Sequence, residues 1–148
     1  MSVKVKICGL TNLADAQVAV DAGADFLVSP GTPVSLVQAL ADAPVPALPG
    51  CATVSEAMTL AAFGFPVLKF FPAESSGGLR WLKAVVEPLP EIRFVPTGGV
   101  NGDNAAAYLA LGNVLAVGGS WVAPAEAIAA GDFAGITARA RIAAALRP

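Results

Sequence analysis

The chain has 148 residues, a length that favours one domain with a substantial core and argues against two. A formal charge of −2 and the absence of any Lys/Arg cluster exclude an extended basic surface for nucleic acid. The sequence contains no histidine, and its two cysteines have no metal-binding spacing. We therefore expect no metal or other cofactor, and chemistry that depends on Lys, carboxylates, hydroxyls, Cys or backbone groups.

The composition also bears on location. The N-terminal residues MSVKVKICG lack the apolar region of a signal peptide. The uncharged run at 104–125 reaches membrane-spanning length, but glycines and Pro124 interrupt it, which favours helix, turn and strand. We expect a cytoplasmic protein with no membrane partner, in which Cys8 and Cys51 are free thiols.

Short β-type runs alternate with Ala-rich helical stretches along the chain. The runs predict strands at 3–8, 26–29, 45–49, 66–71, 93–96 and 114–118. The stretches between them predict helices near 12–22, 33–42, 54–63, 78–86, 102–111 and 133–146. Crossovers of this length join parallel strands in right-handed βαβ units. The pattern therefore predicts a parallel α/β fold of six βα units.

Two architectures suit this pattern: an open doubly wound sheet, or part of a (βα)8 barrel. The loops after the strands are short and rich in Gly, Pro, Thr and Ser, and the last two resemble the phosphate site that barrels build after strands 7 and 8. A GxGxxG fingerprint after the first strand is absent. These features favour the barrel. At several helix starts the sequence predicts a cap, notably a capping box at Thr53–Glu56.

The stretch at 67–74, VLKFFPAE, places Lys69 inside an apolar run that Pro72 ends. In one interpretation, the lysine stem reaches the barrel mouth and the amine pairs with a carboxylate. In the other, desolvation favours the neutral amine, which can attack a carbonyl carbon. Position alone favours the first interpretation, whereas the flanking sequence favours the second.

Five motifs resemble those of 2-keto-3-deoxy-6-phosphogluconate (KDPG) aldolase in order and spacing. They are FLVSPG (26–31), PALPGCATVSEAM (46–58), LKFFPAE (68–74), RFVPTGGV (93–100) and VLAVGGSW (114–121). The resemblance runs from about residue 24 to the C-terminus. It implies a class I aldolase with a (βα)8 barrel and a trimeric assembly, in which Lys69 forms a Schiff base and 2-keto acids or sugar-acid phosphates are cleaved to pyruvate.

The same resemblance implies a set of binding residues. Pro30 and Phe71 would line the substrate pocket, and Thr97 would hydrogen-bond the carboxylate or hydroxyls of the substrate. A phosphate would be bound by backbone N–H groups and one hydroxyl from Gly98, Gly99, Gly119 and Ser120. Gly98–Gly99 and Gly118–Gly119 are each a pair of consecutive glycines. The alternative for both pairs is a tight turn that requires positive φ.

The sequence departs from the family pattern at its start. The family's proton-shuttle glutamate lies on a segment like LEVTLR, and nothing in this sequence matches it. Residues 1–26 instead resemble the first βα unit of phosphoribosylanthranilate isomerase, where Cys8 matches the catalytic base. We interpret Cys8 and Cys51 as packing residues. We expect one domain over 1–148, with an isomerase-like unit at 1–26 and aldolase-like units at 27–148, as a truncated or recombined TIM barrel.

Six strands are too few for the usual eight-stranded closure. An open sheet exposes two edges, which predicts a homo-oligomer paired through those edges or a rearranged open sandwich. We expect an aldolase-family protein that is weak or inactive without the shuttle glutamate. The alternative is a non-catalytic engineered or evolutionary barrel fragment, and a third, weaker option is isomerase activity through Cys8.

Overall fold

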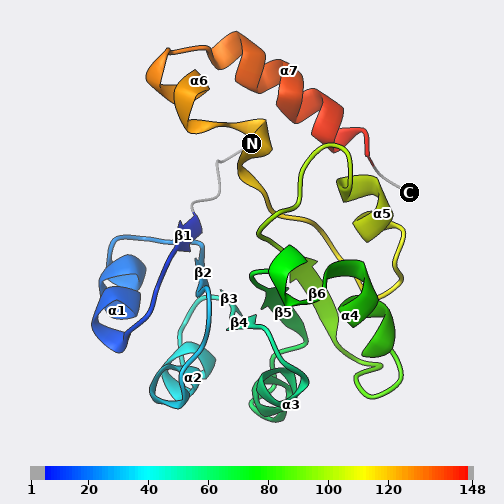
Figure 1. Ribbon diagram of the computed structural model, residues 1–148. Helices are drawn as coiled ribbons and strands as arrows, with labels where there is room; N and C mark the ends of the chain where they lie inside the picture. The colour runs from blue at the N-terminus through cyan, green and yellow to red at the C-terminus, as the bar shows by residue number, and fades with distance from the viewer. Residues whose placement is uncertain (1–5, 147–148) are drawn as a thin grey trace.

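The computed structural model describes residues 6–146 and forms a parallel α/β fold (Figure 1). Of the strand expected at 3–8, residues 3–5 lie outside this range. Each sheet has three strands, in the orders β1-β2-β3 and β4-β5-β6, and every neighbouring pair is parallel. The strands are β1 (Lys6–Cys8), β2 (Phe26–Val28), β3 (Ala47–Leu48), β4 (Gly50–Cys51), β5 (Val67–Phe70) and β6 (Arg93–Pro96).

The two sheets meet at Pro49, where the sequence predicted a single strand at 45–49. β3 pairs with β2, while β4, one residue further along, pairs with β5. Pro49 has no N–H to donate, but its carbonyl accepts a hydrogen bond from Lys69 N at 2.9 Å. The six strands therefore follow one another around a curved wall (Figure 1).

Seven α-helices and two short 3-10 helices occur in the described residues. The α-helices are α1 (Leu13–Asp21), α2 (Val34–Ala41), α3 (Val54–Ala62), α4 (Gly78–Ala84), α5 (Ala105–Leu109), α6 (Ala125–Ala129) and α7 (Phe133–Ala144). The 3-10 helices are η1 (Glu74–Ser76) and η2 (Ser120–Val122). Helices α1 to α4 lie along the outside of the wall, whereas α6 and α7 lie at the top of Figure 1, away from them. The sequence predicted neither α6 nor the 3-10 helices.

Side-chain caps fix the starts of several helices. The capping box predicted at Thr53 and Glu56 is confirmed, because each side chain accepts a hydrogen bond from the other residue's backbone N–H. Asn12 caps α1 by accepting from Asp15 N at 2.9 Å. Helix α5 begins later than the helix predicted near 102–111; its N-cap is Asn104, whose side chain accepts from Asn101 N instead of from the helix.

The segment predicted as a sixth strand, 114–118, forms two isolated bridges to β6 and its loop. Leu115 N donates to Phe94 O, and Gly118 N donates to Pro96 O, both at 2.9 Å. The three steps from Leu115 to Gly118 thus match two steps from Phe94 to Pro96, which places one extra residue in the pairing. Pro96 also lacks the N–H that a regular ladder needs. The segment 114–118 therefore forms no continuous strand, and β6 is the last strand of the described residues.

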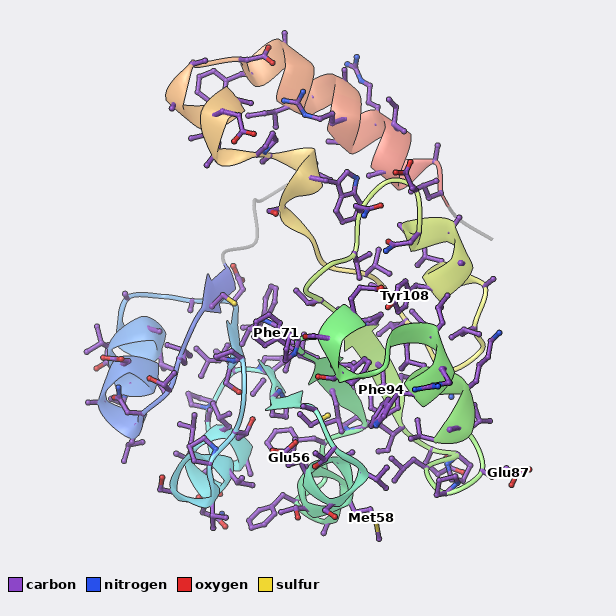
Figure 2. The ribbon with its side chains drawn as sticks, viewed as in Figure 1. Glu56, Met58, Phe71, Glu87, Phe94 and Tyr108 are labelled. Atoms are coloured by element: carbon purple, nitrogen blue, oxygen red, sulfur yellow. The ribbon has the colours of Figure 1, made fainter. Side chains whose placement is uncertain are left out.

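The core lies between the wall and its outer helices. Leu68, Phe70 and Phe94 are completely buried, and the ring of Trp81 stacks on Phe70 with a centroid distance of 4.2 Å. The same indole meets Phe94 edge-on at 5.3 Å. Phe94 and Tyr108, which are both buried in this core, are labelled in Figure 2. Cys51 is 1 % exposed, which confirms its interpretation as a packing residue.

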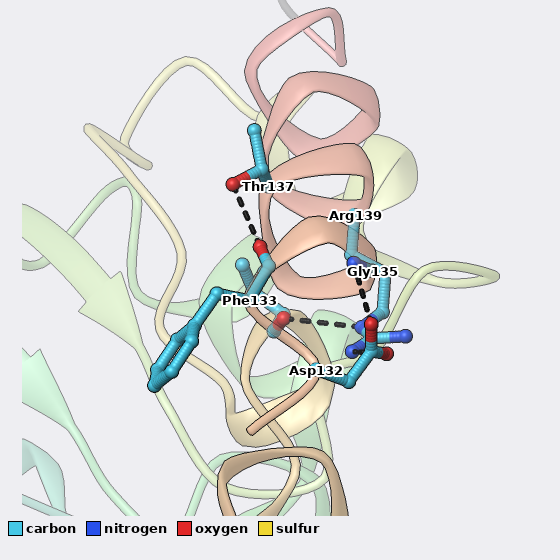
Figure 3. Close-up of polar contacts among 6 residues, drawn as sticks. Asp132, Phe133, Gly135, Thr137 and Arg139 are labelled. Carbon is cyan, nitrogen blue, oxygen red and sulfur yellow. Dashed lines mark hydrogen bonds and ion pairs between the residues drawn. The ribbon is translucent and has the colours of Figure 1, made fainter. Parts of the chain in front are cut away.

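Polar contacts hold the N-terminal end of helix α7 (Figure 3). Asp132 accepts a hydrogen bond from Gly135 N at 2.9 Å and forms an ion pair with Arg139 at 3.6 Å. Arg139 Nε also donates to the carbonyl of Val122 at 3.2 Å, which ties α7 to η2. No α7 side chain is buried. Across the described part of the chain, no helix is long and apolar enough to cross a membrane.

Candidate active site

Strand alternation explains why a lysine lies in the apolar run at 67–71. Side chains on a strand point to opposite faces in turn, so Leu68 and Phe70 enter the core while Lys69 points to the concave face of the wall. Lys69 is 6 % exposed. Its Nζ donates to Cys8 Sγ at 3.8 Å and lies 4.8 Å from the ring centroid of Phe71. The amine is thus buried beside a thiol and an aromatic face.

A cavity of about 630 Å³ opens in front of Lys69. Most of the predicted site residues line it together: Lys69, Phe71, Thr97, Gly98, Gly99, Gly119 and Ser120. Figure 2 shows Phe71 in the interior of the wall. Pro30 is not among the lining residues, and its carbonyl instead lies against Gly50. The cavity therefore brings the lysine and both glycine loops to one place.

The two glycine pairs differ in backbone conformation. Gly98 and Gly99 have φ of +93° and +79°, so the turn interpretation applies to this pair. For Gly119 that interpretation is wrong, because its φ of −168° is extended backbone. A Cβ at Gly119 would lie 2.2 Å from the ring of Trp121 and 2.6 Å from Val100 O. Position 119 therefore requires a glycine because the surrounding atoms leave no room for a side chain.

Backbone hydrogen bonds hold the loops after β5 and β6 in contact. Thr97 N donates to Phe70 O at 2.9 Å, and Ala73 N donates to Thr97 O at 2.8 Å. Thr97 also bridges to Gly118 in the last loop, where a Cβ would lie 2.7 Å from Thr97 Oγ1. Three loops that are distant in sequence therefore converge on one rim of the cavity.

The glutamate of the KFFPAE motif faces away from the cavity. The hydroxyl of Tyr108, a fully buried residue, donates a hydrogen bond to Glu74 Oε1. Burial, and then this bond to the carboxylate, raise the pKa of Tyr108 well above its ordinary value. Glu74 also packs against Gly99 from outside. The Cβ and Cγ of Glu74 thus lie against the Gly98–Gly99 turn, and Glu74 does not line the cavity.

Cys8 is the residue whose placement the sequence interpretation missed. The thiol is exposed and lines the cavity beside Lys69, so the packing interpretation is wrong for Cys8. Its position at the end of β1 carried the signal, because the ends of parallel strands meet at one rim. Cys51 is different: burial, and then the charge of Glu56, raise its pKa to about 12, which keeps it an unreactive thiol.

Comparisons with known proteins agree on one family. The KDPG and KHG aldolase family matches residues 6–139, a range that includes most of the segment with isomerase resemblance. The KHG/KDPG aldolase of Escherichia coli K12 is 46% identical over 121 residues, covering 82% of this chain and 57% of that protein. The 2-dehydro-3-deoxy-phosphogluconate aldolase of Dickeya dadantii is 48% identical over 120 residues, covering 81% and 56%.

Solved structures give the same result. KDPG aldolase of Legionella pneumophila, with pyruvate captured as a covalent carbinolamine, superimposes with a TM-score of 0.88 at 38% identity, over 95% of this chain and 67% of that one. The Zymomonas mobilis ZM4 enzyme with 3-phosphoglycerate gives the same score and identity, over 95% and 66%. The chain spans a little over half the length of the curated relatives it matches. By its sequence and its fold, the chain belongs to the KDPG and KHG aldolase family.

Proposed function

We propose that the chain forms a Schiff base between Lys69 and pyruvate-like 2-keto acids, as a class I aldolase that acts on KDPG or related substrates. The observation that carries this proposal is the buried amine of Lys69 in the wall of a cavity that both glycine loops also line. The Legionella relative, which holds pyruvate as a covalent carbinolamine, supports the same chemistry.

The residues around Lys69 suit each step of this chemistry. The amine attacks the ketone carbon, and loss of water leaves an iminium ion. When the bond between the third and fourth substrate carbons breaks, its electron pair moves toward the iminium nitrogen and an enamine forms. The Phe71 ring, 4.8 Å from Nζ, excludes water from one side of the amine.

The glycine loops are the proposed site for the phosphate. Gly98 and Gly99 offer backbone N–H groups in a positive-φ turn, and Gly119 and Ser120 offer an N–H and a hydroxyl across the cavity. The 3-phosphoglycerate in the Zymomonas relative is consistent with a phosphorylated three-carbon ligand in this family. Thr97, between the two loops, is the proposed partner of the substrate carboxylate or hydroxyls. Pro30 remains a predicted pocket residue.

We further propose that the 148 residues form one domain, six βα units of a partial barrel, that cleaves KDPG weakly or not at all by itself. A second cavity of about 970 Å³ shares Phe26, Leu48 and Val95 with the first, as expected when a barrel interior is not fully enclosed. No segment of the sequence matches the shuttle-glutamate strand, and loss of acid–base catalysis typically costs about 10²–10⁴-fold. Exposed edges would then pair in a homo-oligomer.

Borohydride trapping with pyruvate tests the Schiff base. Cleavage after glutamate, which does not occur before a proline such as Pro88, places the two relevant lysines in separate peptides, Lys69 in 57–74 and Lys83 in 75–91. We expect one reduced pyruvate adduct on 57–74, none on 75–91, and no adduct in Lys69→Ala. Lys83→Ala is the matched control, because Lys83 is exposed on α4 and should leave trapping unchanged. Absence of an adduct on 57–74 in the unmodified chain would refute the proposal.

A non-catalytic barrel fragment is the second candidate, favoured by the partial coverage of the relatives. The two candidates differ in the rate of pyruvate formation from KDPG at high protein concentration. If the chain and Lys69→Ala give equal background rates, and no adduct forms, the fragment interpretation holds. A rate that depends on Lys69 would exclude it.

A further inference from the structure

Cys8 lies beside the reacting nitrogen, and the proposed function gives it no role. Its Sγ is 3.8 Å from Lys69 Nζ, and its side chain is exposed to the cavity solvent. The other described side chains that line the cavity are apolar or carry hydroxyls, and the remaining lining residues are glycines. Cys8 and Lys69 are therefore the ionisable pair of this cavity.

We propose that Cys8 is the acid–base residue that moves the proton at the methyl carbon of the pyruvyl group. This proposal rests on the proposed Schiff base at Lys69. The Cys8 thiolate takes one methyl proton of the pyruvyl iminium ion and becomes a thiol. The C–H electron pair forms the enamine double bond, and the C=N electron pair passes to the nitrogen.

The reverse step completes the cleavage reaction. As the bond to the aldehyde fragment breaks, the Cys8 thiolate takes the hydroxyl proton of that fragment, which leaves an aldehyde, an enamine and a Cys8 thiol. The enamine then needs one proton at the same carbon before water can release pyruvate. The Cys8 thiol supplies this proton and returns to the thiolate. Atoms and charge balance in both directions, and no oxidant, reductant or metal takes part.

The distances suit this transfer. The methyl carbon of a pyruvyl iminium lies two bonds from the nitrogen, or about 2.5 Å from it by standard bond lengths. A sulfur atom 3.8 Å from the same nitrogen can therefore reach that carbon without movement of the backbone. Cysteine is among the side chains that serve as general acids and bases. The second thiol, Cys51, is buried away from the cavity and cannot substitute.

Solvent deuterium exchange into the pyruvate methyl group, followed by proton NMR, isolates this step. We expect the 148-residue chain to catalyse exchange, and Cys8→Ser and Cys8→Ala to slow it by roughly 100-fold or more. Borohydride should still trap pyruvate on 57–74 in both variants, because the lysine remains. Cys51→Ala is the matched control, and we expect it to exchange at the rate of the unmodified chain.

Each outcome decides the inference. Exchange at the unmodified rate in Cys8→Ser would overturn it, because a serine hydroxyl is a poor acid and base with nearly the same shape. Loss of the adduct together with exchange in folded Cys8 variants would assign Cys8 to Schiff-base formation and overturn the methyl-proton role. If the unmodified chain forms no adduct, the proposed function fails and the inference fails with it. Circular dichroism of each variant verifies the fold.

Discussion

Replacing Lys69 by methionine should stabilise the protein while it removes the proposed chemistry. Lys69 is 6 % exposed, and the polar partner of its amine among the described residues is a thiol at 3.8 Å, which is a weak acceptor. Burial of a polar group without a good hydrogen bond costs roughly 1–3 kcal/mol. The contact with the Phe71 ring offsets about 0.5–2 kcal/mol of this, and a methionine sulfur regains a similar contact with the ring.

We therefore expect Lys69→Met to raise the free energy of unfolding by about 1–2 kcal/mol. With an m-value of about 2 kcal/mol/M in urea, the midpoint should rise by roughly 0.5–1 M. Equilibrium urea unfolding, followed by circular dichroism, measures this change. Lys83→Met is the matched control and should change stability by less than about 0.5 kcal/mol, because Lys83 is exposed. A lower midpoint for Lys69→Met would refute the reasoning and show that the folded protein satisfies the amine well.

Two further predictions concern the helix cap and the glycine turn. Hydrogen bonds from Ala52 N, and then from Thr53, lower the pKa of Glu56 from 4.5, so its stabilising effect is present above that value and is lost as the pH falls through the folded-state pKa. Urea midpoints between pH 7 and pH 3 should therefore fall more steeply for the unmodified chain than for Glu56→Gln, and equal slopes would contradict this. Gly99→Ala should cost more than about 1 kcal/mol, because φ is +79° and the new Cβ would lie 2.5 Å from Glu74 Cγ. Gly112→Ala has no atom within 4 Å and should unfold at a midpoint no lower than that of the unmodified chain; the Gly99 reasoning fails if both variants behave alike.

The sequence was informative where local chemistry determines the structure. Parallel strands alternating with capped helices follow from hydrophobic period and turn residues, and the Thr53–Glu56 cap is found as predicted. The breaks at Pro49 and Pro96 were harder to predict. Each proline ends a short run that was predicted as a strand, and the loss of one donor becomes important only once the neighbouring strand is known.

In the candidate site, too, the residues with a local motif could be predicted, whereas a residue whose placement depends on tertiary packing could not. The lysine and the glycine loops could be predicted because each carries a local motif, and strand ends place them on one rim. Cys8 was wrongly predicted to be a packing residue, because a free cysteine is among the most buried residue types, and its place at the end of a strand was the local signal to the contrary. Its exposure depends on what covers the end of β1, and that is a property of tertiary packing.

The junction at Pro49 divides the reactive groups between two supports. β1, which carries Cys8, belongs to one three-stranded sheet, whereas β5, which carries Lys69, belongs to the other. The separation of thiol and amine is therefore set by the angle at which the sheets join and not by one continuous ladder of hydrogen bonds. A rotation at this corner would change the distance between the two groups without breaking a ladder hydrogen bond within either sheet.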